Sequence, residues 1–284
     1  MVEKLQVEGG EIAFEVSGSG PLVVLAHGMG DSRRSYRFVV PALVEAGFRV
    51  ANVDIRGCGE SSAAWGSYAR SDIAGDLLAV IRRLGGPAVI IGQSISGGAG
   101  TIAAARAPQD VVGVIELAPF TRTQKVDPVG LIRRARHRRG MTRLMTMMLR
   151  GSVTAWLRYL DLAIPLKPAD WTQEQAHIAR RLEDPARMAG LRAMGKTSPT
   201  DAGEQLPHVT VPVLVVMGTA DPDWADPRAE GEGIVAALPS GIGRLAVIDG
   251  AGHYPHVERP EEVLELAVPF LRSALQARTG AADA

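Results

Sequence analysis

Short, uninterrupted apolar runs alternate along most of this chain with stretches in which apolar residues recur at helical spacing. A short run made almost entirely of apolar residues predicts a strand buried on both faces, and such runs occur at 21–26, 48–53, 88–91, 111–117, 211–217 and 245–248. The helical stretches between them are at 34–46, 71–84, 95–107, 225–237 and 260–277. This repetition predicts an α/β fold, a mostly parallel sheet flanked by helices.

Two segments depart from this rhythm. Residues 3–8 and 11–17 alternate apolar and polar around a Gly-Gly pair, which predicts an antiparallel hairpin. Between 120 and 205 no solid apolar run occurs, and apolar residues follow helical spacing at 141–149, 153–162 and 174–194. We therefore expect a core made of residues 1–119 and 206–284, interrupted by a helical insertion over 120–205.

Charge and composition exclude several classes of protein. The 31 basic and 31 acidic side chains leave no formal net charge, which argues against a nucleic-acid-binding protein. No apolar run approaches the ~20 residues of a membrane span, so none is expected. The first eight residues are charged and alternating, unlike a secretory signal. Together with a single cysteine, Cys58, this predicts a cytoplasmic protein without an internal disulfide.

The most informative local pattern is Gly92-Gln-Ser94-Ile-Ser-Gly-Gly, which joins a predicted buried strand to a predicted helix of small residues. A serine on so tight a turn has its hydroxyl exposed above the sheet, and the amide of Ile95 points toward any anion that forms there. The pattern alone is weak, because similar sequences often only tighten a turn. Its strand–turn–helix context nevertheless makes Ser94 a candidate nucleophile.

Four further loop motifs each follow a predicted strand: His27-Gly-Met-Gly30, Asp54-Ile-Arg-Gly-Cys-Gly-Glu-Ser61, Gly218-Thr-Ala-Asp221 and Gly250-Ala-Gly-His253. With the serine motif, they make the chain resemble the α/β-hydrolase family over nearly its whole length outside the insertion. The order Ser94, Asp221, His253 is the order of nucleophile, acid and base in that fold. The resemblance also implies that residues 120–205 form a helical cap over the nucleophile.

The resemblance implies a role for each motif residue. A serine hydroxyl is a poor nucleophile until a base removes its proton, and His253 titrates in the right range to do so. Asp221 would orient the imidazole and stabilise its charged form, although Asp223 stands two residues away and is the alternative acid. The backbone amides of Met29 and Ile95 would form the oxyanion hole.

Other residues of these loops are predicted to be structural. His256 is a second histidine near the predicted base but lacks its glycine-rich lead-in, and His27 and Arg56 are expected to brace loops beneath the site. Cys58 is expected to be a buried, inert thiol. The tryptophans are expected in the core or in the pocket lining: Trp65, Trp156, Trp171 and Trp224.

One position departs from the pattern of the resembled family. Ser96 stands where that family usually has glycine, two residues after the nucleophile. Plant strigolactone and karrikin receptors also carry Ser-x-Ser there; they keep a triad but act chiefly as sensors. A slow-turnover ligand sensor of the strigolactone-receptor type is therefore an alternative, although the following Gly97 and Gly98 are more typical of hydrolases.

The first part of the insertion is strongly basic. Between Pro119 and Arg150 there are nine Lys or Arg residues and one acidic residue, Asp127. Five of the arginines cluster tightly: Arg133, Arg134, Arg136, Arg138 and Arg139. Such a cluster is either a solvated helix face or a surface for an anionic substrate, an acyl carrier protein or an anionic membrane.

Together these patterns predict a serine hydrolase that cleaves an ester, lactone or thioester of a small organic molecule through an acyl-enzyme on Ser94. Dehalogenases and epoxide hydrolases of the resembled family use an aspartate nucleophile, so the serine argues against both. C–C bond hydrolases and cofactor-free perhydrolases share the triad and stay open as alternatives. No metal-ligand cluster or phosphate-binding loop is apparent in the sequence, so no metal or organic cofactor is expected.

Overall fold

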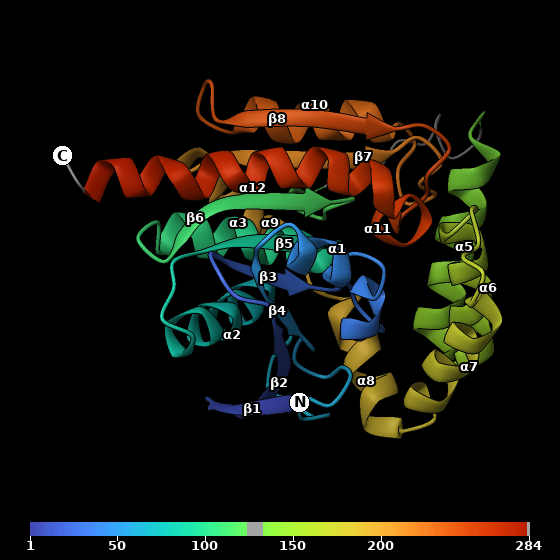
Figure 1. Ribbon diagram of the computed structural model, residues 1–284. Coiled ribbons are helices and arrows are strands. Elements are labelled where there is room, and N and C mark those ends of the chain that lie inside the picture. Colours follow the sequence, from blue (N-terminus) through green and yellow to red (C-terminus); the bar gives the residue numbers. More distant parts are fainter. Residues whose placement is uncertain (124–132, 283–284) are drawn as a thin grey trace.

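A single sheet runs through the molecule. The computed structural model describes residues 1–123 and 133–282 (Figure 1). The sheet has eight strands in the order β1-β2-β4-β3-β5-β6-β7-β8. β1 and β2 form an antiparallel hairpin, β2 also pairs antiparallel with β4, and all other pairings are parallel. The strands are β1 Val2–Val7, β2 Gly10–Ser17, β3 Leu22–Ala26, β4 Arg49–Val53, β5 Ala88–Gln93, β6 Val111–Leu117, β7 Val213–Gly218 and β8 Gly243–Ile248.

Helices cover both faces of this sheet, as the solid apolar runs predicted. Along β5, Ile90 packs into one buried cluster with α2 (Arg70–Arg83), α3 (Ile95–Arg106) and α10 (Pro227–Ala237). Its neighbours Val89 and Ile91 pack into a second cluster with α1 (Val40–Glu45) and α12 (Pro260–Ala282). Since successive side chains of a strand point to opposite faces, an apolar strand is buried by two helix layers. The predicted α/β fold is confirmed.

Two predicted helices are each interrupted at a proline. The stretch 34–46 forms a short 3₁₀ helix, η1 (Arg33–Tyr36), and then α1, which has Pro41 in its first turn. The stretch 174–194 forms α7 (Trp171–Leu182) and α8 (Pro185–Met194), and Asp184 caps α8 by accepting from the Ala186 amide. Proline lacks the N–H that a helix interior needs but is favoured at a helix start, so each proline begins a new helix.

The helices between β6 and β7 have a hydrophobic cluster largely of their own. They are α5 (Ala135–Arg150), α6 (Val153–Ala163), α7, α8 and α9 (Thr200–Gly203), followed by a 3₁₀ turn, η2 (Leu206–His208). Their cluster centres on Trp156, Tyr159 and Leu191 and is joined by Tyr254 and Val257. In Figure 1, α5, α6 and α7 stand beyond the arrowheads of β6 and β8, at the carboxyl ends of the parallel strands.

None of the described helices combines the length and the hydropathy that a bilayer span requires.

Candidate active site

Ser94 has an unusual backbone conformation. It is the single residue between the end of β5 and the start of α3, with φ 56° and ψ −119°. L-residues rarely adopt a positive φ, and such strain concentrates at functional sites. The turn tolerates no side chain at Gly92, where a Cβ would collide with the carbonyl oxygen of Ser96. The sequence between a buried strand and a helix therefore folds into the sharp turn that was expected around Ser94.

The loop after β3 lies directly against this turn. A Cβ placed on Gly28 would lie 3.1 Å from Ser94 Cβ, so the glycine allows the close approach that brings the Met29 region beside the serine. The Ser96 hydroxyl donates to the carbonyl oxygen of His27 at 2.5 Å and is fully buried. Ser96, the departure from the family pattern, thus links the first turn of α3 to the loop of the predicted oxyanion hole.

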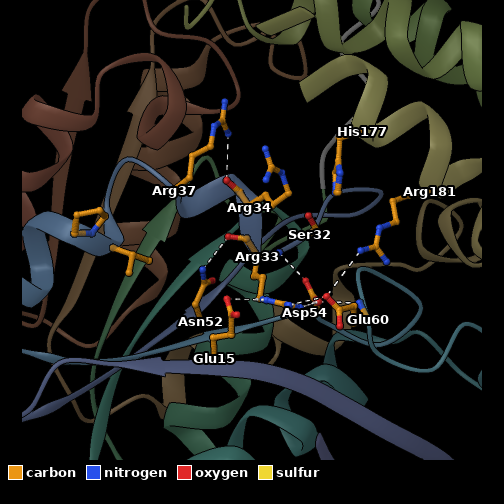
Figure 2. Close-up of a pocket in the computed structure, with 12 residues that line it drawn as sticks. Glu15, Ser32, Arg33, Arg34, Arg37, Asn52, Asp54, Glu60, His177 and Arg181 are labelled. Atoms are coloured by element: carbon orange, nitrogen blue, oxygen red, sulfur yellow. Dashed lines mark hydrogen bonds and ion pairs between the residues drawn. The ribbon is translucent and has the colours of Figure 1, made fainter. Parts of the chain in front are cut away.

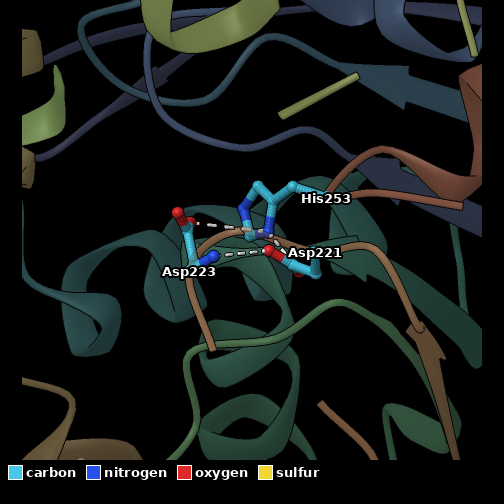
Figure 3. Close-up of side chains that lie close together, drawn as sticks. All are labelled: Asp221, Asp223 and His253. Carbon is cyan, nitrogen blue, oxygen red and sulfur yellow. Dashed lines mark hydrogen bonds and ion pairs between the residues drawn. The ribbon is translucent and has the colours of Figure 1, made fainter. Parts of the chain in front are cut away.

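The second group of predicted site residues lies at the ends of β7 and β8 (Figure 3). His253 Nδ1 lies 2.8 Å from Asp221 Oδ2 and 3.6 Å from Asp223 Oδ2. Asp223 Oδ2 instead accepts a 2.7 Å hydrogen bond from the hydroxyl of Tyr159 on α6. Asp221 Oδ1 accepts from the Asp223 amide at 2.9 Å, which holds the two aspartates in a fixed arrangement. Asp221 is therefore the direct partner of the imidazole.

These groups are buried, and burial changes how they titrate. Burial by itself lowers the pKa of His253, but the carboxylates of Asp221 and Asp223 outweigh it and raise the pKa to about 9. Burial raises the pKa of Asp223 to about 6. The imidazole is thus held where its charged form is strongly stabilised by two anions.

Two residues connect Ser94 to His253. Gln93 donates from Nε2 to the His253 carbonyl oxygen at 3.0 Å. The Phe120 amide donates to the Ser94 carbonyl at 3.1 Å, and the Phe120 ring meets the His253 ring edge-on with centroids 5.8 Å apart. Among the described side chains, Ser94 Oγ makes no hydrogen bond to His253 Nε2. Catalytic hydrogen bonds are often long without substrate, so this geometry is compatible with proton transfer in a complex.

The loop that carries His253 is anchored on both sides. Glu258 accepts from the amides of Gly252 at 2.9 Å and Tyr254 at 3.3 Å, the two residues that flank the histidine. It also accepts from the amide of Leu166 in the α6–α7 connection at 3.1 Å. Burial raises the pKa of Glu258 to about 7. Glu258 thus fixes the position of the imidazole relative to the inserted helices.

Asp221, Asp223 and His253 also form the one group of side chains in the described ranges whose arrangement could hold a metal ion, with ligand atoms within 4.8 Å of one another. The hydrogen bonds within the group favour an oriented imidazole over a metal centre. Nδ1 is already bonded to Asp221, and Asp223 Oδ2 accepts from Tyr159. A cation here would have to displace these bonds, so the arrangement fits an oriented imidazole better than a metal centre.

A cavity of about 210 Å³ opens beside Ser94. Met29 and Ile95, the residues of the predicted oxyanion hole, line it. Leu144 of α5 and Met194 of α8 contribute to the opposite wall. The cavity therefore lies between the sheet and the helices that follow β6.

The comparison with protein families identifies the fold. The sequence profile described as the alpha/beta hydrolase family matches residues 23–266. The chain belongs to the alpha/beta hydrolase family. Solved structures of this fold include an esterase from Exiguobacterium antarcticum, with a TM-score of 0.79 and 20% identity over 96% of this chain and 100% of that one. An enol-lactonase from Burkholderia xenovorans has a TM-score of 0.73 and 24% identity over 95% of this chain and 100% of that one.

Sequence relatives of this alpha/beta hydrolase include a partial match and a match over nearly the whole chain. Over 92 residues it is 41% identical to bifunctional epoxide hydrolase 2 of Sus scrofa, a match that covers 31% of this chain and 17% of that protein. It is 26% identical over 292 residues to an uncharacterized protein of Mycobacterium tuberculosis, which covers 93% of this chain and 79% of the relative. This chain thus spans less than a fifth of the matched epoxide hydrolase.

A second, larger cavity of about 440 Å³ lies between η1, β4 and α7 (Figure 2). Arginines line it, and each is paired with an acidic group. Arg33 contacts Asp54 and also Glu60 at 2.8 Å, and Arg37 binds Asp170 through two hydrogen bonds of 2.6 and 2.7 Å. No nucleophile paired with a base lines this cavity in the described ranges. The ion pair of Arg37 with Asp170 instead connects the end of η1 to the start of α7.

The loop residues predicted to be structural do not line the Ser94 cavity. His256 stacks on Tyr36 with ring centroids 4.6 Å apart, and burial lowers the pKa of its imidazole to about 3. His27 donates from Nδ1 to Gly28 O and accepts from the Ile55 amide. Arg56 binds Asp76 through two hydrogen bonds of 2.8 and 2.9 Å. Cys58 is buried, and burial raises the pKa of its thiol to about 12. The tryptophans pack in or against hydrophobic clusters: Trp65, Trp156, Trp171 and Trp224.

The basic cluster on the insertion is less uniform than its sequence indicated. Arg133, Arg138 and Arg139 are exposed, and Arg134 lies 3.7 Å from Asp226. Arg136 is half-buried and donates to the carbonyl oxygens of Ala220 and Leu162. It therefore joins α5 to the loop that carries Asp221, and it is not part of an outward-facing anion-binding surface. None of the five arginines lines the described wall of the Ser94 cavity.

Sequence reasoning missed several residues of this site. Gln93, Phe120, Tyr159 and Glu258 act through contacts between distant segments, which no local pattern marks. Arg70 carried a signal, because it lies on the apolar face of α2, three, four and seven residues before buried apolar positions (Ile73, Ala74 and Leu77). Burying a charged side chain on such a face is costly unless another group hydrogen-bonds or pairs with it.

Proposed function

We propose that this alpha/beta hydrolase cleaves a carboxylic ester or lactone of a small organic molecule through an acyl-enzyme on Ser94. The observation that carries the proposal is the strained backbone conformation of Ser94, a residue that lines a cavity. Phe120 lines the same cavity and contacts the buried His253, which is hydrogen-bonded to Asp221. A serine in that position needs an imidazole base and an acid that orients it, and the proposal assigns these roles to His253 and Asp221, in the loops after β8 and β7.

In the proposed reaction, His253 Nε2 accepts the Ser94 proton as the oxygen attacks the substrate carbonyl. Asp221 accepts a hydrogen bond from Nδ1–H of His253, so the unprotonated Nε2 is free to accept the serine proton. The Asp221 carboxylate also stabilises the imidazolium that forms. The amides of Met29 and Ile95 stabilise the tetrahedral oxyanion. His253 then protonates the leaving alcohol and activates the water that releases the acid. In this scheme the helices between β6 and β7 act as a cap that closes the cavity.

Relatives support ester hydrolysis over other reactions of the family. Structural neighbours include an esterase and an enol-lactonase. The matched epoxide hydrolase shares sequence over 31% of this chain, but an aspartate nucleophile is expected for that chemistry and position 94 is serine. The same Ser-His-Asp set also serves C–C hydrolases, perhydrolases and slow sensors, so turnover is the discriminating measurement.

Covalent labelling and turnover together test the proposal. We expect a fluorophosphonate to label the protein stoichiometrically at Ser94, because an activated serine attacks phosphorus as it attacks a carbonyl. A panel of short acyl esters and lactones should show turnover of many cycles per minute for at least one member. A label mapped by mass spectrometry to another residue would refute the nucleophile. Turnover that stops after one equivalent would favour the sensor.

The rate should depend on pH through His253. A protonated imidazole cannot accept the serine proton, so kcat/KM should fall about tenfold per pH unit below the pKa of the base. Since that pKa is raised to about 9, the rising limb should extend well above pH 7. Asp223→Asn removes one of the two anions that stabilise the imidazolium, so its limb should move to lower pH. This would be contradicted if the rising limb of Asp223→Asn moved to higher pH. It would also be contradicted if kcat/KM of the wild-type protein stayed constant from pH 6 to 9 while chemistry limits the rate.

A further inference from the structure

The Ser94 cavity contains one buried charge that the proposed mechanism does not use. Its wall is mainly apolar, with Met29, Ile95, Phe120 and Leu144 among the lining residues. Arg70 is the only ionisable side chain on the described wall, and it is 4% exposed. A guanidinium in so apolar a site is costly unless a partner neutralises it.

Among the described residues, the direct contacts of Arg70 are with uncharged groups only. Nε donates to the Phe120 carbonyl oxygen at 2.8 Å and Nη1 donates to Thr197 Oγ1 at 3.0 Å, and both acceptors are uncharged. Asp201 favours the cation from a distance, but its two oxygens accept from the backbone amides of Ser71 and Ala202. Within the described ranges, no carboxylate lies at ion-pair distance from Arg70. Burial accordingly lowers the pKa of the guanidinium to about 10.

The same contacts hold the guanidinium in place. Thr197 Oγ1 donates onward to the Met194 carbonyl at 2.7 Å, and the Arg70 stem passes over Gly98, where a Cβ would lie 2.8 Å from Arg70 Cδ. A guanidinium has five N–H donors, and the described residues accept from two of those of Arg70. The others are available to a ligand at little entropic cost, because the side chain is already fixed.

We infer that Arg70 binds a carboxylate of the substrate, so that the preferred substrates are esters with an anionic carboxylate a few methylenes from the scissile carbonyl. Guanidinium and carboxylate match in a bidentate pair, and the substrate charge would offset the burial of the arginine. A single cation in an otherwise apolar wall suits a monoanion better than a phosphate dianion. The volume of about 210 Å³ is below the roughly 300–1,000 Å³ of sites for drug-sized ligands, so the acyl chain is short.

This inference rests on the proposed ester hydrolysis, and two matched substrates test it. Monoethyl glutarate carries the carboxylate, and ethyl 5-oxohexanoate replaces one carboxylate oxygen by a methyl group. The wild-type protein should favour the anionic ester in kcat/KM. In Arg70→Gln that preference should fall by about 30-fold or more, mainly through KM, as expected for the loss of a charged hydrogen-bonded pair. Arg70→Lys should retain part of it.

Arg82→Gln is the matched control, because Arg82 is on the same helix but exposed and paired with Asp110 at 2.8 Å. It should keep the wild-type preference. Equal loss on both esters in Arg70→Gln and Arg70→Lys would mean that Arg70 is only structural and would overturn the inference. Calorimetry with glutarate separates this from failure of the proposed function. Glutarate that binds wild-type but not Arg70→Gln protein, with neither ester hydrolysed, would refute ester hydrolysis and retain the carboxylate site.

Discussion

Replacing Ser94 with alanine is expected to lower kcat for ester hydrolysis by about 10⁶-fold, because no other group can form the acyl-enzyme. The fold should survive. Alanine meets the same backbone strain as serine at φ 56°, and the hydroxyl faces a cavity instead of filling the core. Initial rates on the best ester of the panel, with thermal unfolding in parallel, measure both effects.

Ser96→Ala is the matched control for this prediction, since it removes a hydroxyl two residues away. The Ser96 hydroxyl donates to His27 O, so its loss leaves a buried carbonyl unsatisfied and should cost about 1 kcal/mol of stability. Its effect on rate should stay below about tenfold, because it acts only through the position of the adjacent loop. A Ser94→Ala protein that retains more than a percent of wild-type turnover would show that the nucleophile lies elsewhere.

The second large effect is expected at Asp221. Asp221→Asn should lower kcat by about 10⁴-fold, because an amide facing Nδ1 favours the tautomer in which Nε2 carries the proton. Asp221 Oδ2 is 2.8 Å from His253 Nδ1, whereas Asp223 Oδ2 is 3.6 Å away and already bonded to Tyr159. Asp223→Asn should therefore lower kcat by about tenfold or less at a pH where the base is neutral.

The two aspartate variants control for each other, since both exchange a buried carboxylate for an amide in the same loop. They should be compared on the plateau of each pH profile, so that a shifted pKa is not mistaken for a lower kcat. If Asp223→Asn proves the more damaging of the two, Asp223 is the acid partner. Similar thermal unfolding of both proteins would exclude misfolding as the cause of either result.

The elements of the fold follow from local patterns in this sequence. Solid apolar runs predicted the parallel strands, because a strand between two helix layers has no polar face. The Gly92–Gly98 motif predicted a sharp turn at Ser94, because only small residues fit between strand and helix there. The family and the mostly parallel sheet were predictable for the same reason, since each motif lies at the end of a strand.

Only the tertiary structure decided which side chains meet. Asp221 and Asp223 are indistinguishable by spacing, and the packing of α6 separates them by placing Tyr159 against Asp223. The prolines that split two predicted helices could have been read from the sequence, but the burial of Arg70 beside Ser94 could not. Local propensity determines where strands, turns and helices form, whereas contacts between residues far apart in the chain depend on how those elements pack.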